Sequence, residues 1–124
     1  MIQLHVELPD RPGELGKLAT LLGDAEININ AISAESGRGR TYMSLIVDHP
    51  ARARGLLGKA GYTCAEKTVL VVRLADRSKA LAALARKLGA AGVNITSVIH
   101  LESIGGHAQL ALGVDDLARA RALV

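Results

Sequence analysis

The sequence predicts an α+β fold built from two copies of one small unit, each with an antiparallel sheet and helices on one face. Two observations predict it: an internal repeat, and alternating strand-like and helix-like patterns within each copy. The length of 124 residues suffices for one ordinary domain or two very small ones. The apolar fraction of 49% is enough for a packed core and excludes a disordered chain.

The repeat appears when the sequence is compared with itself. Asp10–Ile29 and Asp76–Ile95 are identical at ten of twenty positions. After one inserted residue, eleven of the 23 positions of Glu35–Leu57 agree with the second copy. They include Ala51–Arg54, which recurs as Ala118–Arg121. Paired Asp-Arg, Asn-Ile and Glu-Ser matches at a nearly constant shift are typical of a duplication, and not of chance similarity between segments rich in alanine and leucine.

Periodicity assigns the elements of the first copy. Residues 2–8 alternate apolar and polar, which predicts a half-buried strand. Leucines at helical spacing predict an amphipathic helix over 13–25, with Pro12 suited to the first helical position. Whether Asp10 or Arg11 precedes this helix stays open. The remaining elements are a strand at 27–35, a turn at 37–40, a strand at 42–47, a helix at 50–60 and a strand at 62–66.

The second copy repeats this order. Its elements are a strand at 68–74, a helix at 79–91, a strand at 94–102, a turn at 105–106, a strand at 108–114 and a helix at 116–123. Each unit therefore has the βαββαβ order of a ferredoxin-like fold, with domains 1–67 and 68–124. Val124 aligns with Leu57, so the second unit ends before its fourth strand, and its first strand is expected to be an exposed edge. A partner strand could come from the other copy, from another protomer or from an exchanged 62–66 segment.

The segment LPDRPGEL at Leu8–Leu15, with Asn28-Ile29 sixteen residues after Pro12, resembles the signature of the ACT domain. ACT domains are small amino-acid-sensing modules, attached to metabolic enzymes or standing alone. The resemblance covers both copies, although the second has Ser78-Lys79 where the first has Pro-Gly. It implies a non-catalytic regulatory protein that holds a small amino acid between two ACT units.

The resemblance also assigns the ligand-binding residues. One site combines a loop of the first copy with a strand of the second, through Asp10, Arg11, Pro12, Gly13, Glu14, Leu15, Asn94 and Ile95. A pseudo-symmetric site combines the 76–81 loop, with Asp76, and the pair Asn28 and Ile29. Because Lys79 replaces a glycine in that loop, the second site is expected to be weaker, empty or altered in specificity.

The residue types suit this chemistry. The N-terminus of a helix offers unpaired amides to a carboxylate. A glycine lets a ligand approach the backbone, and asparagine can both donate and accept hydrogen bonds. Each residue also has a simpler interpretation. Gly13 permits a turn, Asp10 and Asp76 cap helices or face solvent, and Asn28 and Asn94 bind neighbouring backbone groups.

Other residues give no sign of catalysis or of a cofactor. The four histidines lack the spacing of metal ligands, and Cys64, the only cysteine, is expected to be a partly buried thiol that forms no intrachain disulfide. There is no glycine-rich phosphate loop and no Ser-His-Asp grouping. The arginines of the two Ala-Arg-Ala-Arg runs are expected on solvated helix faces.

Composition limits the partners. A net charge of +3 does not by itself imply nucleic acid, and an aromatic fraction of 2% argues against RNA stacked on a sheet. No apolar run has the ~18 residues of a membrane span, and neither a signal peptide nor a cysteine pair is present. We therefore expect a cytoplasmic homodimer that binds an amino acid and passes the signal to another polypeptide, such as an amino-acid metabolic enzyme. The alternative is a regulatory subunit of an amino-acid biosynthetic enzyme that acts mainly through protein–protein assembly.

Overall fold

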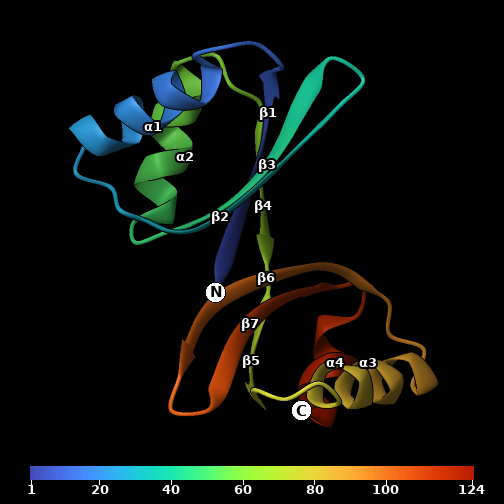
Figure 1. Cartoon of the computed structure of the whole chain (residues 1–124). Helices are drawn as coiled ribbons and strands as arrows, with labels where there is room; N and C mark the ends of the chain where they lie inside the picture. Colours follow the sequence, from blue (N-terminus) through green and yellow to red (C-terminus); the bar gives the residue numbers. More distant parts are fainter. The chain divides into compact units, whose positions relative to one another are not determined.

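The structure is a computed structural model that describes residues 1–124, and it contains the strands and helices predicted from the repeat (Figure 1). The first copy forms β1 (Ile2–Pro9), α1 (Glu14–Asp24), β2 (Ile29–Gly37), β3 (Arg40–Val47), α2 (Pro50–Lys59) and β4 (Cys64–Thr68). The second forms β5 (Leu70–Ala75), α3 (Ala80–Ala90), β6 (Ile95–Ile104), β7 (His107–Val114) and α4 (Leu117–Leu123). The chain divides into two compact units, Ile2–Lys67 and Thr68–Val124 with Met1.

The first unit has a four-stranded sheet in the order β2-β3-β1-β4. The β3 strand runs antiparallel to both β1 and β2. Alternate residues of β1 point toward α1 and α2, which lie on one side of the sheet (Figure 1). The core is aliphatic and contains Leu4, Val6, Leu8, Leu18, Leu22, Ile27, Met43, Leu45, Val47, Ala53 and Leu57.

The second unit has a three-stranded sheet in the order β5-β7-β6, again antiparallel. Its core repeats that of the first unit, with Val72, Leu88, Val93, Leu110, Leu112, Val114 and Ala120. The β5 strand, which corresponds to β1, carries no neighbour on the edge where β1 carries β4. The predicted α+β fold of two ferredoxin-like units, the second without a fourth strand, is confirmed.

The start of α1 differs from the prediction. The helix begins at Glu14, and Gly13 precedes it with φ of 88°. This left-handed backbone cannot continue into a right-handed helix, so Pro12 lies in a turn and not at the first helical position. Leu15 is 49% exposed, because it lies in the first turn, and Leu18 and Leu22 make the core contacts.

An asparagine–aspartate pair closes the same corner in both units. The backbone N–H of Asn28 donates to Oδ1 of Asp48 (3.0 Å), and the N–H of Asp48 donates to the carbonyl of Asn28 (3.2 Å). Asn94 and Asp115 repeat these two bonds at 2.8 and 3.1 Å. The backbone of each predicted site asparagine therefore joins the start of one strand to the end of its neighbour.

An arginine closes the end of the first helix in each unit. Arg52 donates to the carbonyl of Ala25 (2.7 Å), and Arg119 donates to the carbonyl of Ala91 (2.9 Å). These two arginines lie on exposed helix faces, as predicted, and each also binds a backbone carbonyl. Carbonyls at a helix C-terminus lack partners within the helix, and a guanidinium from the neighbouring helix supplies one.

Replacing Arg52 with alanine should lower the free energy of unfolding of the first unit by about 1 kcal/mol, because the Ala25 carbonyl loses its charged donor. Arg54→Ala is the matched control, since Arg54 makes an exposed ion pair with Glu66 that contributes at most about 0.5 kcal/mol. Urea unfolding followed by tyrosine fluorescence measures both. Equal losses in the two variants would contradict this role of Arg52.

No helix of the chain is long and apolar enough to span a membrane.

Candidate ligand site

The loop between β1 and α1, Asp10–Gly13, is called the motif loop here. No atom lies within 4 Å of the position that a side chain at Gly13 would occupy. The first helical hydrogen bond runs from the N–H of Lys17 to the carbonyl of Gly13 (3.0 Å). No side chain caps α1, so the amides of Leu15 and Gly16 at its N-terminus are open to a ligand.

Asp10 ties the motif loop to the β2–β3 hairpin. Its carboxylate accepts hydrogen bonds from Ser36 Oγ (3.1 Å) and Thr41 Oγ1 (3.3 Å), and its N–H donates to the carbonyl of Gly39 (3.2 Å). Asp10 therefore holds the loop in place. It does not cap α1, although the sequence left that role open.

Arg11 and Glu14 pair with each other. The Arg11 guanidinium donates through two nitrogens to Glu14 Oε1, at 2.8 and 3.0 Å. The pair lines a cavity of about 260 Å³ next to the motif loop. Glu7, Lys17, Arg40 and Tyr62 also line this cavity.

This loop cavity contains both charge types that a free amino acid requires. Its lysine and arginines suit a carboxylate, and its glutamates suit an ammonium group. The hydroxyl of Tyr62 is buried and has no hydrogen-bond partner, which leaves one unsatisfied polar group in the wall. Glu7, Arg40 and Tyr62 were not predicted as site residues, because no local motif connects positions so far apart in the sequence.

Asn28 and Ile29 lie at the other end of the sheet from the motif loop of their own unit. Pro9, just before the loop, pairs with Arg40, whereas Ile29 pairs with Val47. Arg40 and Val47 lie seven positions apart on β3, which is about 23 Å along an extended strand. The loop and the asparagine of one unit therefore cannot contact the same small ligand.

The corresponding loop of the second unit has a different backbone. Lys79 takes the place of Gly13 with φ of −98°, in the ordinary right-handed region. Asp76 keeps the N–H bond to the hairpin, to the carbonyl of Gly106 (2.8 Å), but Ala108 stands where Thr41 supplies a hydroxyl. A cavity of about 350 Å³ beside this loop is lined by Arg77 and Lys79 and by no carboxylate.

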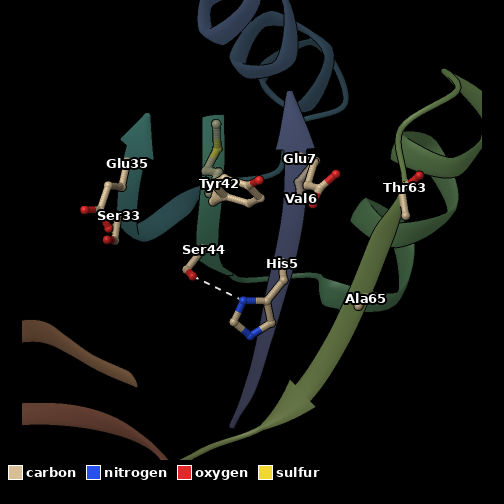
Figure 2. A pocket seen from close by; sticks show the side chains of 10 residues that line it. His5, Val6, Glu7, Ser33, Glu35, Tyr42, Ser44, Thr63 and Ala65 are labelled. Atoms are coloured by element: carbon tan, nitrogen blue, oxygen red, sulfur yellow. Dashed lines mark hydrogen bonds between the residues drawn. The ribbon is translucent and has the colours of Figure 1, made fainter. Parts of the chain in front are cut away.

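A third cavity, of about 420 Å³, lies on the strands of the first sheet (Figure 2). His5, Tyr42 and Ser44 project into it from β1 and β3, and Ser44 Oγ lies 3.3 Å from His5 Nδ1. The sequence analysis predicted no function for this surface. The polar residues of the alternating β1 pattern, His5 and Glu7, are the ones that line it.

Partial burial and the nearby charge of Lys67 lower the pKa of His5 below its ordinary value of 6.5. The unfolded chain therefore binds a proton at His5 at a higher pH than the folded chain does. Above about pH 6.5 the free energy of unfolding should keep its full value. It should fall as the pH drops from there toward the pKa of His5 in the folded chain. Urea unfolding between pH 7.5 and 5 measures this slope, and His5→Gln should reduce it. An equal slope in the variant would contradict this.

The other singled-out side chains have local partners. His100 contacts Ser103 (2.8 Å), and His107 contacts the carbonyl of Gly105 (3.1 Å). Cys64 is half-buried against the first core, and burial raises the pKa of its thiol, so the expected partly buried thiol is observed. No group of three or more His, Cys, Asp or Glu side chains could hold a metal ion.

Residues 2–59 match the family model of the ACT domain. The first unit is an ACT domain. The resemblance carried by its LPDRPGEL segment is thereby confirmed. No curated protein matches the chain at a significant level.

Solved structures with the same fold cover nearly the whole chain. A protein from Bacteroides thetaiotaomicron has a TM-score of 0.90 at 20% identity, over 98% of this chain and 84% of its own. The regulatory subunit of aspartate kinase from Thermus thermophilus has a TM-score of 0.71 at 20% identity, over 98% and 89%. The corresponding subunit from Thermus flavus has a TM-score of 0.73 at 19% identity, over 98% and 86%. Each of the two units therefore has a fold that is found in these proteins.

Proposed function

We propose that the chain is a non-catalytic regulatory protein that binds a small amino acid through its ACT domain. The ACT match over residues 2–59 supports this, as does the fold shared with two regulatory subunits of aspartate kinase. Binding would act by population shift, because a ligand that prefers one arrangement of ACT units increases the share of molecules in that arrangement. The responding partner would be an enzyme of amino-acid metabolism, and the protein would act as a homodimer.

The observation that carries the proposal is the open N-terminus of α1 beside a cavity of mixed charge. A ligand carboxylate would accept hydrogen bonds from the free amides of Leu15 and Gly16, which Gly13 leaves accessible. The ammonium group would lie near Glu7 or Glu14 in the loop cavity. Asp10 would act indirectly, since its carboxylate already binds Ser36 and Thr41.

The asparagine of the site would come from a different ACT unit. The strand register excludes Asn28 from the site at the motif loop of its own unit. The family resemblance assigns Asn94 and Ile95 to the motif loop, and Asn28 and Ile29 to the loop of Asp76. Because the second loop has Lys79 in place of glycine and no carboxylate in its cavity, it would bind the same ligand less well.

Calorimetric titration of the chain with each of the twenty amino acids tests the proposal. We expect saturable binding of one amino acid or of a chemically similar few. Asn94→Ala should weaken the stronger site, whereas Asn28→Ala should leave it unchanged and serves as the matched control. No heat of binding with any of the twenty would overturn the proposal.

A second candidate function is regulation by assembly alone, with ligand binding lost. One observation favours it: the loop of the second unit is basic and has no carboxylate in its cavity. In that case the chain would bind none of the amino acids, yet it would form a complex of fixed stoichiometry with an enzyme from its native host. Sedimentation of the mixture with the purified enzyme distinguishes the two candidates.

A further inference from the structure

The sheet of the first unit is hollowed on the face that points away from α1 and α2. The hollow is the cavity of about 420 Å³ shown in Figure 2, called the sheet cavity here. On β1 and β3 its polar residues alternate with core residues, so they lie on the open face. On β4, Thr63 and Ala65 line it, whereas Cys64 between them packs against the core. Small-molecule sites typically have volumes of about 300–1,000 Å³, and this cavity lies within that range.

The strand register places an aromatic ring between two carboxylates in this cavity. Tyr42 of β3 pairs with Glu7 of β1 on one side and with Glu35 of β2 on the other. Paired residues on one face of a sheet have Cβ atoms about 5 Å apart, so both carboxylates lie within reach of the ring. Tyr42 is 47% exposed, which leaves part of the ring open to a ligand.

The lining of the sheet cavity contains these two carboxylates and no lysine or arginine. Glu35 makes no ion pair. Glu7 has one cationic neighbour, Arg40, whose Nη2 lies 3.6 Å from its Oε2, and both side chains are about half exposed. His5 is uncharged at neutral pH, because burial and the nearby charge of Lys67 lower its pKa below the ordinary value of 6.5. The lining therefore carries negative charge that the protein compensates only in part.

The second unit lacks this arrangement, although it repeats the strand pairing of the first. Gln109 stands at the position of Tyr42 and pairs with Arg73 and Glu102. A cation thus replaces one of the two carboxylates, and an amide replaces the aromatic ring. The combination of a ring with two carboxylates is therefore a property of the first unit alone.

The neighbouring row of the cavity also differs between the units. In the first unit Ser44 pairs with His5, and its hydroxyl oxygen lies 3.3 Å from Nδ1 of the imidazole. In the second unit Ala111 and Val71 occupy these two positions. Because the same kind of sheet accommodates the apolar pair, the fold does not require the polar one. The polar lining of the first unit therefore calls for another explanation, and a ligand supplies one.

We propose that the sheet cavity binds a linear aliphatic diamine, whose carbon chain crosses the Tyr42 ring and whose two ammonium groups lie near Glu7 and Glu35. The face of an aromatic ring attracts cations, and each carboxylate neutralises one end of the molecule. The two glutamates stand on strands two spacings apart, about 10 Å, which suits a chain of about four or five carbons. This inference does not depend on amino-acid binding at the motif loop.

Two simpler cations fit the sheet cavity less well. A metal ion needs several ligands close together, and no group of three or more His, Cys, Asp or Glu side chains could hold one. A monoamine neutralises one carboxylate and leaves the other without a partner. A diamine satisfies both carboxylates and covers the ring with its apolar chain.

Calorimetric titration of the full chain with diaminobutane, diaminopentane and butylamine tests the proposal, at neutral pH and low ionic strength. We expect saturable binding of at least one of the two diamines. Butylamine should bind about tenfold more weakly, because it lacks the second charge. Equal affinity for butylamine, or no saturable heat with either diamine, would show that the cavity is not a diamine site.

Two substitutions at Tyr42 separate the ring from its hydroxyl. Tyr42→Gln introduces the residue of the second unit and should weaken diamine binding about fivefold, because the cation–π contact is lost. Tyr42→Phe keeps the ring and should bind as the unmodified chain does. Glu35→Gln should lower the affinity for the diamine to that for butylamine. Glu7 is left unchanged, because it also lines the loop cavity, so diamine binding and amino-acid binding are measured separately.

The matched control is Glu102→Gln, which removes the same charge at the corresponding position of the second sheet. It should leave diamine binding unchanged. Tyr42, Glu35 and Glu102 are all exposed, so these substitutions leave both cores intact. If Glu102→Gln weakens binding as much as Glu35→Gln does, or if Tyr42→Gln has no effect, net charge and not this cavity holds the diamine, and the proposal is wrong.

Discussion

Leu18→Ala should lower the free energy of unfolding of the first unit by about 3 kcal/mol, whereas Leu84→Ala should cost the second unit only about 1.5 kcal/mol. The two leucines are counterparts in the repeat and lie on the same face of α1 and α3. Leu18 is fully buried, so its removal leaves a cavity in a closed core. Leu84 is only partly buried and lines an open cavity of about 520 Å³ between β5, α3 and α4, so solvent partly replaces a truncated side chain there.

Hydrogen exchange resolves the two units, because it reports the opening of each helix separately. Tyrosine fluorescence gives an independent measure of the first unit alone, since Tyr42 and Tyr62 both lie there and the chain has no tryptophan. Leu22→Ala and Leu88→Ala are the controls, because both leucines are fully buried and should cost similar amounts. A Leu84→Ala cost equal to that of Leu18→Ala would contradict the partial burial of Leu84.

The duplication explains why so much of the fold was predictable from the sequence. A duplication makes each copy a test of the other, so an ambiguous pattern in one is decided by its counterpart. The alternation of β1 and the leucine spacing of α1 depend only on burial against one shared core, which the sequence pattern records directly. The strand order follows from the βαββαβ sequence of elements, because few topologies pack two helices on one face of such a sheet.

Features that depend on backbone detail or on distant side chains were not predictable. The left-handed Gly13 moved the start of α1 and left Leu15 exposed, although the leucine spacing is regular through that turn. Arg52 reaches a carbonyl 27 residues away in sequence, and no local pattern signals such a bond. The same limit explains why the motif identified the loop but not Glu7, Arg40 and Tyr62, which complete the cavity.

Gly13→Trp should abolish amino-acid binding at the motif loop, under the proposed function. The indole would occupy the open space in front of the α1 amides, where no atom now lies within 4 Å of a side-chain position. The left-handed φ of 88° adds a backbone cost of about 1–2 kcal/mol for any residue with a side chain. Calorimetric titration with the amino acid that the unmodified chain binds gives the readout.

Two further variants separate the bulk of the indole from this backbone cost. Gly13→Ala has the strain without the bulk, so it should lower stability by a similar amount and retain measurable binding. Gly105→Trp places an indole at a second left-handed glycine with open space, at the β6–β7 turn, and should leave binding intact. If Gly13→Trp binds as tightly as the unmodified chain, the amides of α1 do not hold the ligand, and the site must lie elsewhere on the ACT domain. If Gly13→Ala loses binding completely, the left-handed turn itself, and not the space beside it, is what the ligand requires.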